Sequence, residues 1–147
     1  MTAIYAESSA VLSWLLGEPD ADSVVQVLAE AEAVITSELT LVECSRALIR
    51  AQHVEGLSEA AALDRSSRLL RAAAHWTVLG ITSGITERAS ARFPGEPLRT
   101  LDAIHLASAL AARGAVDRLA LLSLDQRLRA AASRTGLELL PAALDPA

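Results

Sequence analysis

Four acidic side chains of this 147-residue chain have types and neighbours that suit metal-assisted chemistry. They are Glu7, Glu43, Asp102 and Asp125. Asp102 is the most informative, because it lies in the first turn of a stretch, 98–110, whose apolar residues are spaced like those of a buried helix. An acid in that position also has a purely structural explanation, since it interacts favourably with the helix N-terminus and Thr100 can act as the cap. The other three acids therefore decide between the two interpretations.

The four carboxylates would repel one another strongly if they met in one cleft, so such a site would need a cation. Oxygen ligands select a hard ion, and no His or Cys stands at ligand spacing, so we expect Mg²⁺ or Mn²⁺ rather than Zn²⁺. Mg²⁺ keeps bound waters and takes substrate phosphates as further ligands, which suits attack of water on a phosphodiester. One carboxylate would orient or deprotonate that water.

The elements that must position these acids follow from an alternation of short apolar segments with amphipathic stretches. The predicted strands are 3–5, 34–36, 76–81, 119–123 and 137–140. The predicted helices are 10–16, 20–31, 40–52, 58–74, 82–91, 100–113 and 126–135. We expect Ser8 or Ser9 to cap the first helix, and the fourth carries Leu63 and Leu70 one heptad apart. Residues 92–99 contain two prolines and a glycine and must form a loop.

Strands that alternate with helices predict an α/β fold, in which a parallel sheet is covered by helices on both faces. Ligand sites in such sheets lie beyond the carboxyl ends of the strands. Glu7 and Asp125 each follow a predicted strand, and Glu43 and Asp102 each lie near the start of a helix that faces the same edge. Without a linker or an internal repeat, we expect one domain over 1–140 and a tail over 141–147.

The composition excludes several function classes. All 13 basic residues are Arg, so the lysines of a P-loop, of Schiff-base catalysis and of a phosphoacceptor receiver domain are missing. A net charge of −5 argues against non-specific binding of duplex nucleic acid, although it leaves RNA open. No apolar run is long enough to span a membrane and no signal peptide is evident, so we expect a cytoplasmic protein without a membrane partner.

Four segments of the chain resemble a known family. They are 5–10, 41–48, 101–107 and 122–128, and they match in order and spacing the PIN-domain ribonucleases, in particular the VapC toxins of type II toxin–antitoxin systems. The string Leu-Asp-Ala-Ile-His-Leu-Ala at 101–107 is the most specific of them. The resemblance covers essentially the whole chain. It implies a three-layer α/β/α sandwich with parallel strand order 3-2-1-4-5.

The resemblance also implies an activity and partners. The activity is an endoribonuclease that depends on Mg²⁺ or Mn²⁺, with Glu7, Glu43, Asp102 and Asp125 as catalytic and metal-binding residues. The implied partners are an RNA substrate, a VapB-like antitoxin that neutralises the enzyme, and a second copy of the chain in a homodimer. None of these partners follows from composition or periodicity.

Residue 7 departs from the family pattern, which has Asp at this position. The extra methylene of Glu7 moves the carboxylate outward, and Mg²⁺ tolerates poor octahedral geometry badly. Ser9 and Ser123 match positions where the family keeps a hydroxyl near a ligand carboxylate, and Arg99 is placed to bind a phosphate. Helix capping for Ser9, a strand-end hydrogen bond for Ser123 and a place on a loop surface for Arg99 would also explain these three residues. His105, one turn after Asp102, is expected to support or pack rather than to act as a base.

Two other interpretations stay open. In the first, the glutamate at position 7 has impaired cleavage, and the chain is a PIN-like domain that binds RNA or an antitoxin. In the second, the four acids are unrelated surface groups, and Asp102→Ala would change little beyond ordinary stability.

Overall fold

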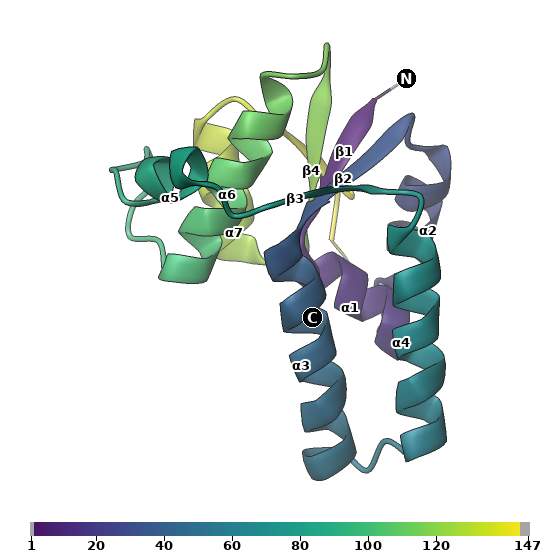
Figure 1. Cartoon of the computed structure of the whole chain (residues 1–147). Helices are drawn as coiled ribbons and strands as arrows, with labels where there is room; N and C mark the ends of the chain where they lie inside the picture. Colours follow the sequence, from purple (N-terminus) through teal and green to yellow (C-terminus); the bar gives the residue numbers. More distant parts are fainter. Residues whose placement is uncertain (1, 145–147) are drawn as a thin grey trace.

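The computed structural model describes residues 2–144 and places five parallel strands in one sheet. The strands are β1 (Ala3–Ala6), β2 (Ala33–Ser37), β3 (Thr77–Leu79), β4 (Leu119–Leu122) and β5 (Glu138–Leu140). Their order is β3-β2-β1-β4-β5, and every neighbouring pair is parallel (Figure 1). The fold class and the strand order that the family resemblance implied are therefore confirmed.

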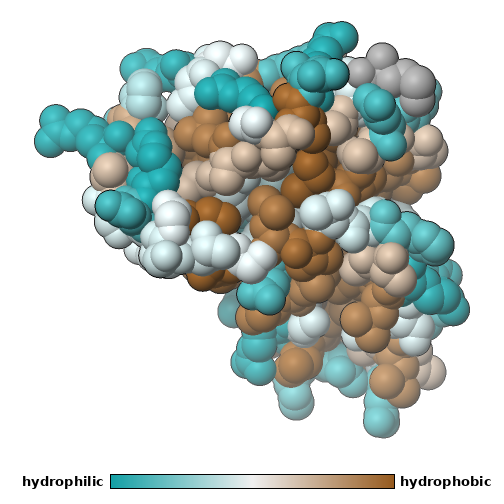
Figure 2. All heavy atoms as spheres, turned by 45° about the horizontal axis from the view of Figure 1, so that its top comes forward, coloured by the Kyte–Doolittle hydropathy of each residue, from teal (hydrophilic) through white to brown (hydrophobic). Residues whose placement is uncertain are grey.

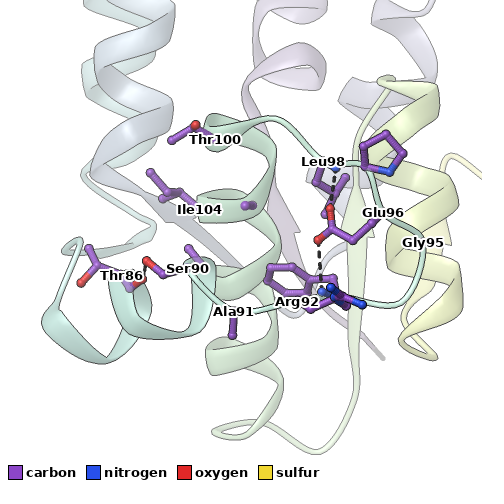
Figure 3. A pocket seen from close by; sticks show the side chains of 13 residues that line it. Thr86, Ser90, Ala91, Arg92, Gly95, Glu96, Leu98, Thr100 and Ile104 are labelled. Carbon is purple, nitrogen blue, oxygen red and sulfur yellow. Dashed lines mark hydrogen bonds between the residues drawn. The ribbon is translucent and has the colours of Figure 1, made fainter.

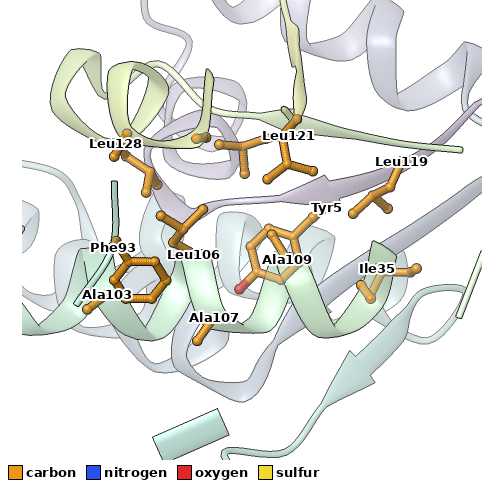
Figure 4. Close-up of a cluster of buried hydrophobic side chains, with 14 of the residues drawn as sticks. Tyr5, Ile35, Phe93, Ala103, Leu106, Ala107, Ala109, Leu119, Leu121 and Leu128 are labelled. Atoms are coloured by element: carbon orange, nitrogen blue, oxygen red, sulfur yellow. The ribbon is translucent and has the colours of Figure 1, made fainter. Parts of the chain in front are cut away.

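Within residues 2–144, seven helices connect the strands and form the two outer layers. They are α1 (Ser8–Leu16), α2 (Ala21–Glu30), α3 (Glu38–Val54), α4 (Glu59–Ala73), α5 (Ser83–Ala89), α6 (Thr100–Arg113) and α7 (Gln126–Arg134). Buried residues of α1 to α4 pack on one face of the sheet, around Ile4 and Leu122. Buried residues of α5 to α7 pack on the other, around Tyr5 and Leu121, as Figure 4 shows. Loop 92–99 precedes α6, as predicted.

The two central strands are buried along their full length, which explains their continuous apolar sequences. The register sets Tyr5 opposite Leu121 and Ala6 opposite Leu122. Because β1 and β4 end level with each other, the residues that follow them, Glu7 and Ser123, emerge side by side. The sheet thus brings two distant parts of the chain to one point.

Two of the predicted helix caps are wrong. The N-cap of α1 is Glu7, whose side chain accepts a hydrogen bond from the backbone N–H of Ser9, whereas Ser8 and Ser9 are the first helical residues. The N-cap of α6 is Arg99, which makes no side-chain capping bond, and Thr100 is already helical. The serine hydroxyls are used instead to hold the Glu7 carboxylate, as described below.

Helices α3 and α4 extend beyond the sheet as a projecting hairpin (Figure 1). Leu63 and Leu70 do not form its buried stripe, because they are 63% and 66% exposed, whereas Ala62 and Leu69 are buried. The heptad spacing was right but its register is one residue earlier. Further exposed apolar residues on this hairpin are Val42, Ile49 and Val54. Hydrophobic residues occur on the hairpin and across the middle of the face drawn in Figure 2.

The predicted tail begins with an anchored residue. Pro141 is buried, and its carbonyl oxygen accepts a hydrogen bond from Arg129 Nη2 at 2.8 Å. The same guanidinium donates to the carbonyl oxygens of Ser123 and Leu140, so it ties the ends of β4 and β5 together. Residues 145–147 of the predicted tail lie outside the described residues. No helix within 2–144 has the length and apolar character needed to cross a membrane.

Candidate active site

A cleft of about 720 Å³ lies at the carboxyl ends of the strands, where the sheet predicted a ligand site. All four predicted acids line it: Glu7, Glu43, Asp102 and Asp125. Each comes from a different element, since Glu7 follows β1, Glu43 lies on α3, Asp102 on α6, and Asp125 precedes α7. Ser9 and Arg99 also line the cleft, whereas Ser123 is fully buried behind it.

The Glu7 carboxylate is engaged through both of its oxygens. Its Oε2 accepts hydrogen bonds from the backbone N–H of Ser9 at 3.1 Å, from the Ser9 hydroxyl, and from Ser123 Oγ at 2.8 Å. Its Oε1 accepts from Ser8 Oγ at 3.0 Å. Glu7 is only 4% exposed, and these four donors replace the water that a buried charge loses.

The two serine hydroxyls are themselves fixed by the backbone that follows β4. Ser9 Oγ accepts from the N–H of Leu124 at 2.9 Å, and Ser123 Oγ accepts from the N–H of Asp125 at 3.1 Å. Because each oxygen accepts from the backbone, its proton is left to point at Glu7. The hydroxyls of Ser9 and Ser123 therefore both hold the Glu7 carboxylate: Ser9 does not cap α1, and Ser123 makes the strand-end bond to Asp125 as well.

The Glu43 carboxylate is held by a buried histidine that the sequence analysis did not count as a site residue. His105 Nε2 lies 2.5 Å from Glu43 Oε1, and His105 Nδ1 lies 2.9 Å from the Tyr5 hydroxyl. A carboxylate only accepts, so in the neutral imidazole Nε2 carries the proton and Tyr5 donates to Nδ1. Burial raises the pKa of Tyr5, with a smaller contribution from the charge of Glu7, which keeps this hydroxyl protonated.

Ser8 connects the two glutamates. Its Oγ lies 3.0 Å from Glu7 Oε1 and 3.0 Å from Glu43 Oε1. One hydroxyl proton can serve only one of these acceptors at a time. His105 already donates to Glu43 Oε1, so the Ser8 proton is left for Glu7 Oε1.

The Asp102 carboxylate has fewer hydrogen-bond donors than the Glu7 carboxylate. Its side chain is 15% exposed, yet its buried Oδ2 has no hydrogen-bond partner among the described residues. The nearest cation, Arg99, holds its Nε 3.9 Å away and is largely exposed. Burial and then the charge of Asp125 raise the pKa of Asp102, against a smaller lowering by Arg99. This carboxylate lacks the donors that stabilise the other buried acid of the cleft, Glu7.

Asp125 is anchored through one oxygen, because Oδ1 accepts from the N–H of Leu128 at 2.9 Å as the cap of α7. Its Oδ2 makes no hydrogen bond among residues 2–144, and the same holds for Glu43 Oε2. Together with the unpaired Asp102, three of the four acids thus keep a free oxygen at the cleft. Only Glu7 has both oxygens occupied.

This donor set fits a hard divalent ion, because carboxylate oxygens are its preferred ligands and Asp102 Oδ2 accepts no hydrogen bond from any described residue, with only the largely exposed Arg99 as a distant cation. As the side chains stand, no three His, Cys, Asp or Glu residues within the described part of the chain are grouped closely enough to hold one ion. The side chains would have to close on the ion.

Sequence reasoning missed Ser8 and underestimated His105. Ser8 was considered only as a cap, since nothing in the sequence shows that its hydroxyl reaches Glu43 across 35 positions. His105 did leave a signal, because it falls one turn after Asp102 in a helix that is otherwise apolar on that face. A polar ring buried to 1% exposure needs partners for both nitrogens.

Comparison with known proteins gives consistent results. The sequence model of the family described as PIN domain matches residues 4–134. Ribonuclease VapC46 of Mycobacterium tuberculosis is 34% identical over 140 residues, which cover 95% of this chain and 98% of that protein. Ribonuclease VapC35 of the same species is 36% identical over 140 residues, with 91% of this chain and 93% of that protein covered.

A solved structure supports the fold. VapBC2 from Rickettsia felis, bound to a DNA fragment from the promoter of its genes, matches with a TM-score of 0.63 at 11% identity and covers 94% of this chain and 97% of that one. At such low identity the likeness concerns the architecture alone.

Proposed function

The chain belongs to the PIN-domain family, among its VapC-type ribonuclease toxins, and from that premise we propose that it is a metal-dependent endoribonuclease that cleaves RNA phosphodiester bonds. The observation that carries the proposal is the meeting of four carboxylates from four elements in one cleft, with a buried Asp102 oxygen left unpaired. Surface acids without a shared role would not be expected to converge in this way, and burying Asp102 without a partner costs free energy.

Asp102, Asp125 and Glu43 would hold Mg²⁺ or Mn²⁺ through their free oxygens, with Glu7 joining them if it releases Ser8. The bound ion would supply Lewis-acid polarisation of a phosphoryl oxygen and a lowered pKa for water. The chain's own groups do the rest. Ser9 and Ser123 orient Glu7, and His105 holds Glu43 Oε1, which leaves the second oxygen of Glu43 available at the cleft for the ion. Arg99, exposed at the rim, can bind a phosphate.

The test is cleavage of a mixed RNA pool by protein freed of any antitoxin, with Mg²⁺, with Mn²⁺ and with EDTA. Asp102→Asn removes the unpaired carboxylate, and Asp117→Asn makes the same chemical change at an exposed residue outside the cleft. We expect cleavage with either metal by the original chain and by Asp117→Asn, and none in EDTA or by Asp102→Asn. Cleavage that persists in EDTA or in Asp102→Asn would overturn the mechanism.

A second candidate function is favoured by the state of Glu7, whose two oxygens both accept hydrogen bonds. If Glu7 cannot join the ion, the chain binds RNA or an antitoxin without efficient turnover. This alternative predicts RNA binding without cleavage under every metal condition, and recovery of cleavage in Glu7→Asp.

For its partners, the proposal includes a VapB-like antitoxin and a homodimer, both acting in the cytoplasm, with 1–140 as the functional domain. The exposed apolar residues of the α3–α4 hairpin support a protein partner, because Val42, Val54 and Leu70 are each more than half exposed. The structural neighbour from Rickettsia felis is itself a VapBC complex.

The two protein partners can be tested separately. Sedimentation of the isolated chain should give twice the monomer mass of 15.4 kDa if it is a homodimer. A cognate antitoxin should suppress cleavage at a one-to-one ratio of subunits. Sedimentation as a monomer, or cleavage unaffected by the antitoxin, would refute the corresponding part of the proposal.

A further inference from the structure

A second cleft, of about 880 Å³, adjoins the acidic one. It lies between the end of α5, the 92–99 loop and the first turns of α6, and Figure 3 shows its lining. Leu98 and Thr100 line both clefts, so the two spaces meet at the start of α6. A polymer whose phosphate lies against Asp102 would pass over Thr100 to enter the second cleft.

The lining offers both hydrogen-bond donors and acceptors. The hydroxyls of Thr86 and Ser90 donate to backbone carbonyls of their own helix, at 3.0 and 2.7 Å, so their oxygens remain available as acceptors. The Arg92 guanidinium and the Thr100 hydroxyl make no hydrogen bond with any described residue. Ile104 and Pro97 add apolar surface. This mixture suits a nucleotide, whose base is flat with polar edges and whose ribose carries hydroxyls.

The second cleft lacks the free carboxylates of the first. Glu96 is the only acid among its lining residues, and both of its oxygens are occupied, since Oε1 accepts from the N–H of Phe93 at 3.1 Å and Oε2 from the N–H of Leu98 at 2.8 Å. Figure 3 shows this side chain folded back onto its own loop. Arg92 and Arg99 stand at the two ends of the loop. Only Arg92 lines the second cleft, whereas Arg99 lines the acidic one and lies 3.9 Å from Asp102. The second cleft therefore presents the unpaired guanidinium of Arg92 beside an acid whose oxygens are both engaged by backbone N–H groups.

We propose that this second cleft binds the nucleotide adjacent to the scissile phosphate of a single-stranded RNA. Single strands are the form in which a base can leave its stack and enter a side pocket, whereas the edges of a paired base are not free to do so. Arg92 contacts the flanking phosphate, and Thr86, Ser90 and Thr100 contact the base or ribose. The inference rests on the proposed function and names the substrate class of that same site.

The test measures RNA binding and turnover separately. Binding of a fluorescein-labelled single-stranded RNA is followed by anisotropy in EDTA on the Asp102→Asn background, and KM and kcat are measured in the cleavage-competent chain. Two changes are made in the second cleft, Arg92→Ala and the pair Thr86→Ala with Ser90→Ala. Arg71→Ala, an exposed arginine on α4 outside both clefts, is the matched control. Thermal unfolding checks that each variant is folded, and Arg92→Gln replaces Arg92→Ala if it is not.

We expect Arg92→Ala to weaken binding about tenfold and to raise KM by a similar factor with kcat nearly unchanged, because a positioning contact to phosphate is lost. The paired variant should weaken binding less, and Arg71→Ala should not change it. A duplex of the same sequence should bind more weakly than the single strand.

Three results would overturn the inference. If the second-cleft variants bind and cleave like Arg71→Ala while cleavage remains metal-dependent, the subsite is refuted and the proposed function stands. If the variants lose only inhibition by the antitoxin, the cleft accepts protein rather than RNA. If the unsubstituted chain neither binds nor cleaves RNA, the proposed function itself fails.

Discussion

The two sides of the acidic cleft solve the problem of a buried carboxylate in opposite ways. Glu7, between β1 and β4, accepts hydrogen bonds from four donors and is almost fully buried. Asp102, on α6, is largely buried but has an oxygen that accepts no hydrogen bond from any described residue and that lies 3.9 Å from Arg99 Nε, and its pKa is raised by burial and by Asp125. One acid is stabilised by the fold, and the other destabilises it.

This difference indicates that Glu7 contributes mainly to the fold, whereas Asp102 contributes mainly to ligand binding. The bonds between Glu7 and Ser123 join the ends of two central strands, so they contribute to folding whether or not an ion is present. The buried oxygen of Asp102 gains a hydrogen-bond donor or a bound ion only when a ligand enters the cleft. An unsatisfied charge held by the surrounding structure is typical of a functional site, because stability is given up where binding must occur.

The contrast between Glu7 and Asp102 is tested most strongly by removing the negative charge of Asp102. Asp102→Asn should lower kcat/KM for RNA by at least 100-fold, since it removes a ligand and a charge from the site. It should also raise Tm by about 2–4 °C at neutral pH, the shift that about 1 kcal/mol produces in a domain of this size. Cleavage kinetics and calorimetry on the same preparation test both. A loss of activity together with a loss of stability would mean that Asp102 supports the fold.

At Glu7 the opposite effect on stability is expected, because removing a hydrogen-bond donor to this carboxylate should destabilise the fold. Ser123→Ala removes a hydroxyl that donates to Glu7 at 2.8 Å, and we expect it to cost about 1 kcal/mol of unfolding free energy. Activity should fall about tenfold, because the carboxylate is less well oriented. Urea unfolding and kcat/KM measure the two effects. Ser133→Ala, an exposed serine on α7, is the control. Unchanged stability in Ser123→Ala would contradict the assigned role.

Replacing Glu7 with the shorter Asp should have a moderate effect on cleavage. In Glu7→Asp the carboxylate cannot reach Ser8, Ser9 and Ser123 together, so one oxygen becomes free for an ion. Asp is also a good N-cap, so α1 should be retained. We expect a several-fold rise in cleavage with Mg²⁺ and a smaller rise with Mn²⁺. A fall in activity would show that the longer glutamate is suited to this site.

The smallest effect concerns pH. Because the pKa of Asp102 is raised in the folded chain, the folded state binds its proton more tightly than the unfolded state does. Asp102 therefore reduces stability as pH rises from the unfolded pKa, near 3.8, through the folded one. The Tm advantage of Asp102→Asn should be present at neutral pH and should diminish as the pH falls toward 3.8, which calorimetry across that range measures. An advantage that is constant with pH would refute this cause.

The sequence predicted the layers and the strand order, because apolar periodicity and the family resemblance both act at the level of whole elements. For the same reason it placed the four acids at one edge of the sheet, where they line one cleft without being close enough to hold an ion. It did not predict how the side chains bond within the cleft. The cap of α1 shows why. Ser9 is a good cap by residue type, but its hydroxyl donates to Glu7 and accepts a hydrogen bond from the backbone N–H of Leu124, which is 115 positions away. Such long-range competition is invisible to local propensity.

The α4 helix shows a second limit. Leu63 and Leu70 have the spacing of a buried stripe, and so do Ala62 and Leu69, and periodicity alone cannot choose between two such registers. The choice depends on which side of the helix contacts α1 and α3. Exposed leucines on this hairpin are consistent with the protein partner proposed above.

The most direct test of the central claim is to locate a paramagnetic ion on the chain. With Mn²⁺ added to the isotope-labelled protein, the amide signals of Ser9, Thr100 and Leu124, all beside the acidic cleft, should broaden first. Signals of Ala61 and Arg71 on α4 should persist, and Asp102→Asn should abolish the selective broadening. If instead the signals broaden around acids scattered over the surface, or the same pattern survives in Asp102→Asn, the four carboxylates do not form a metal site.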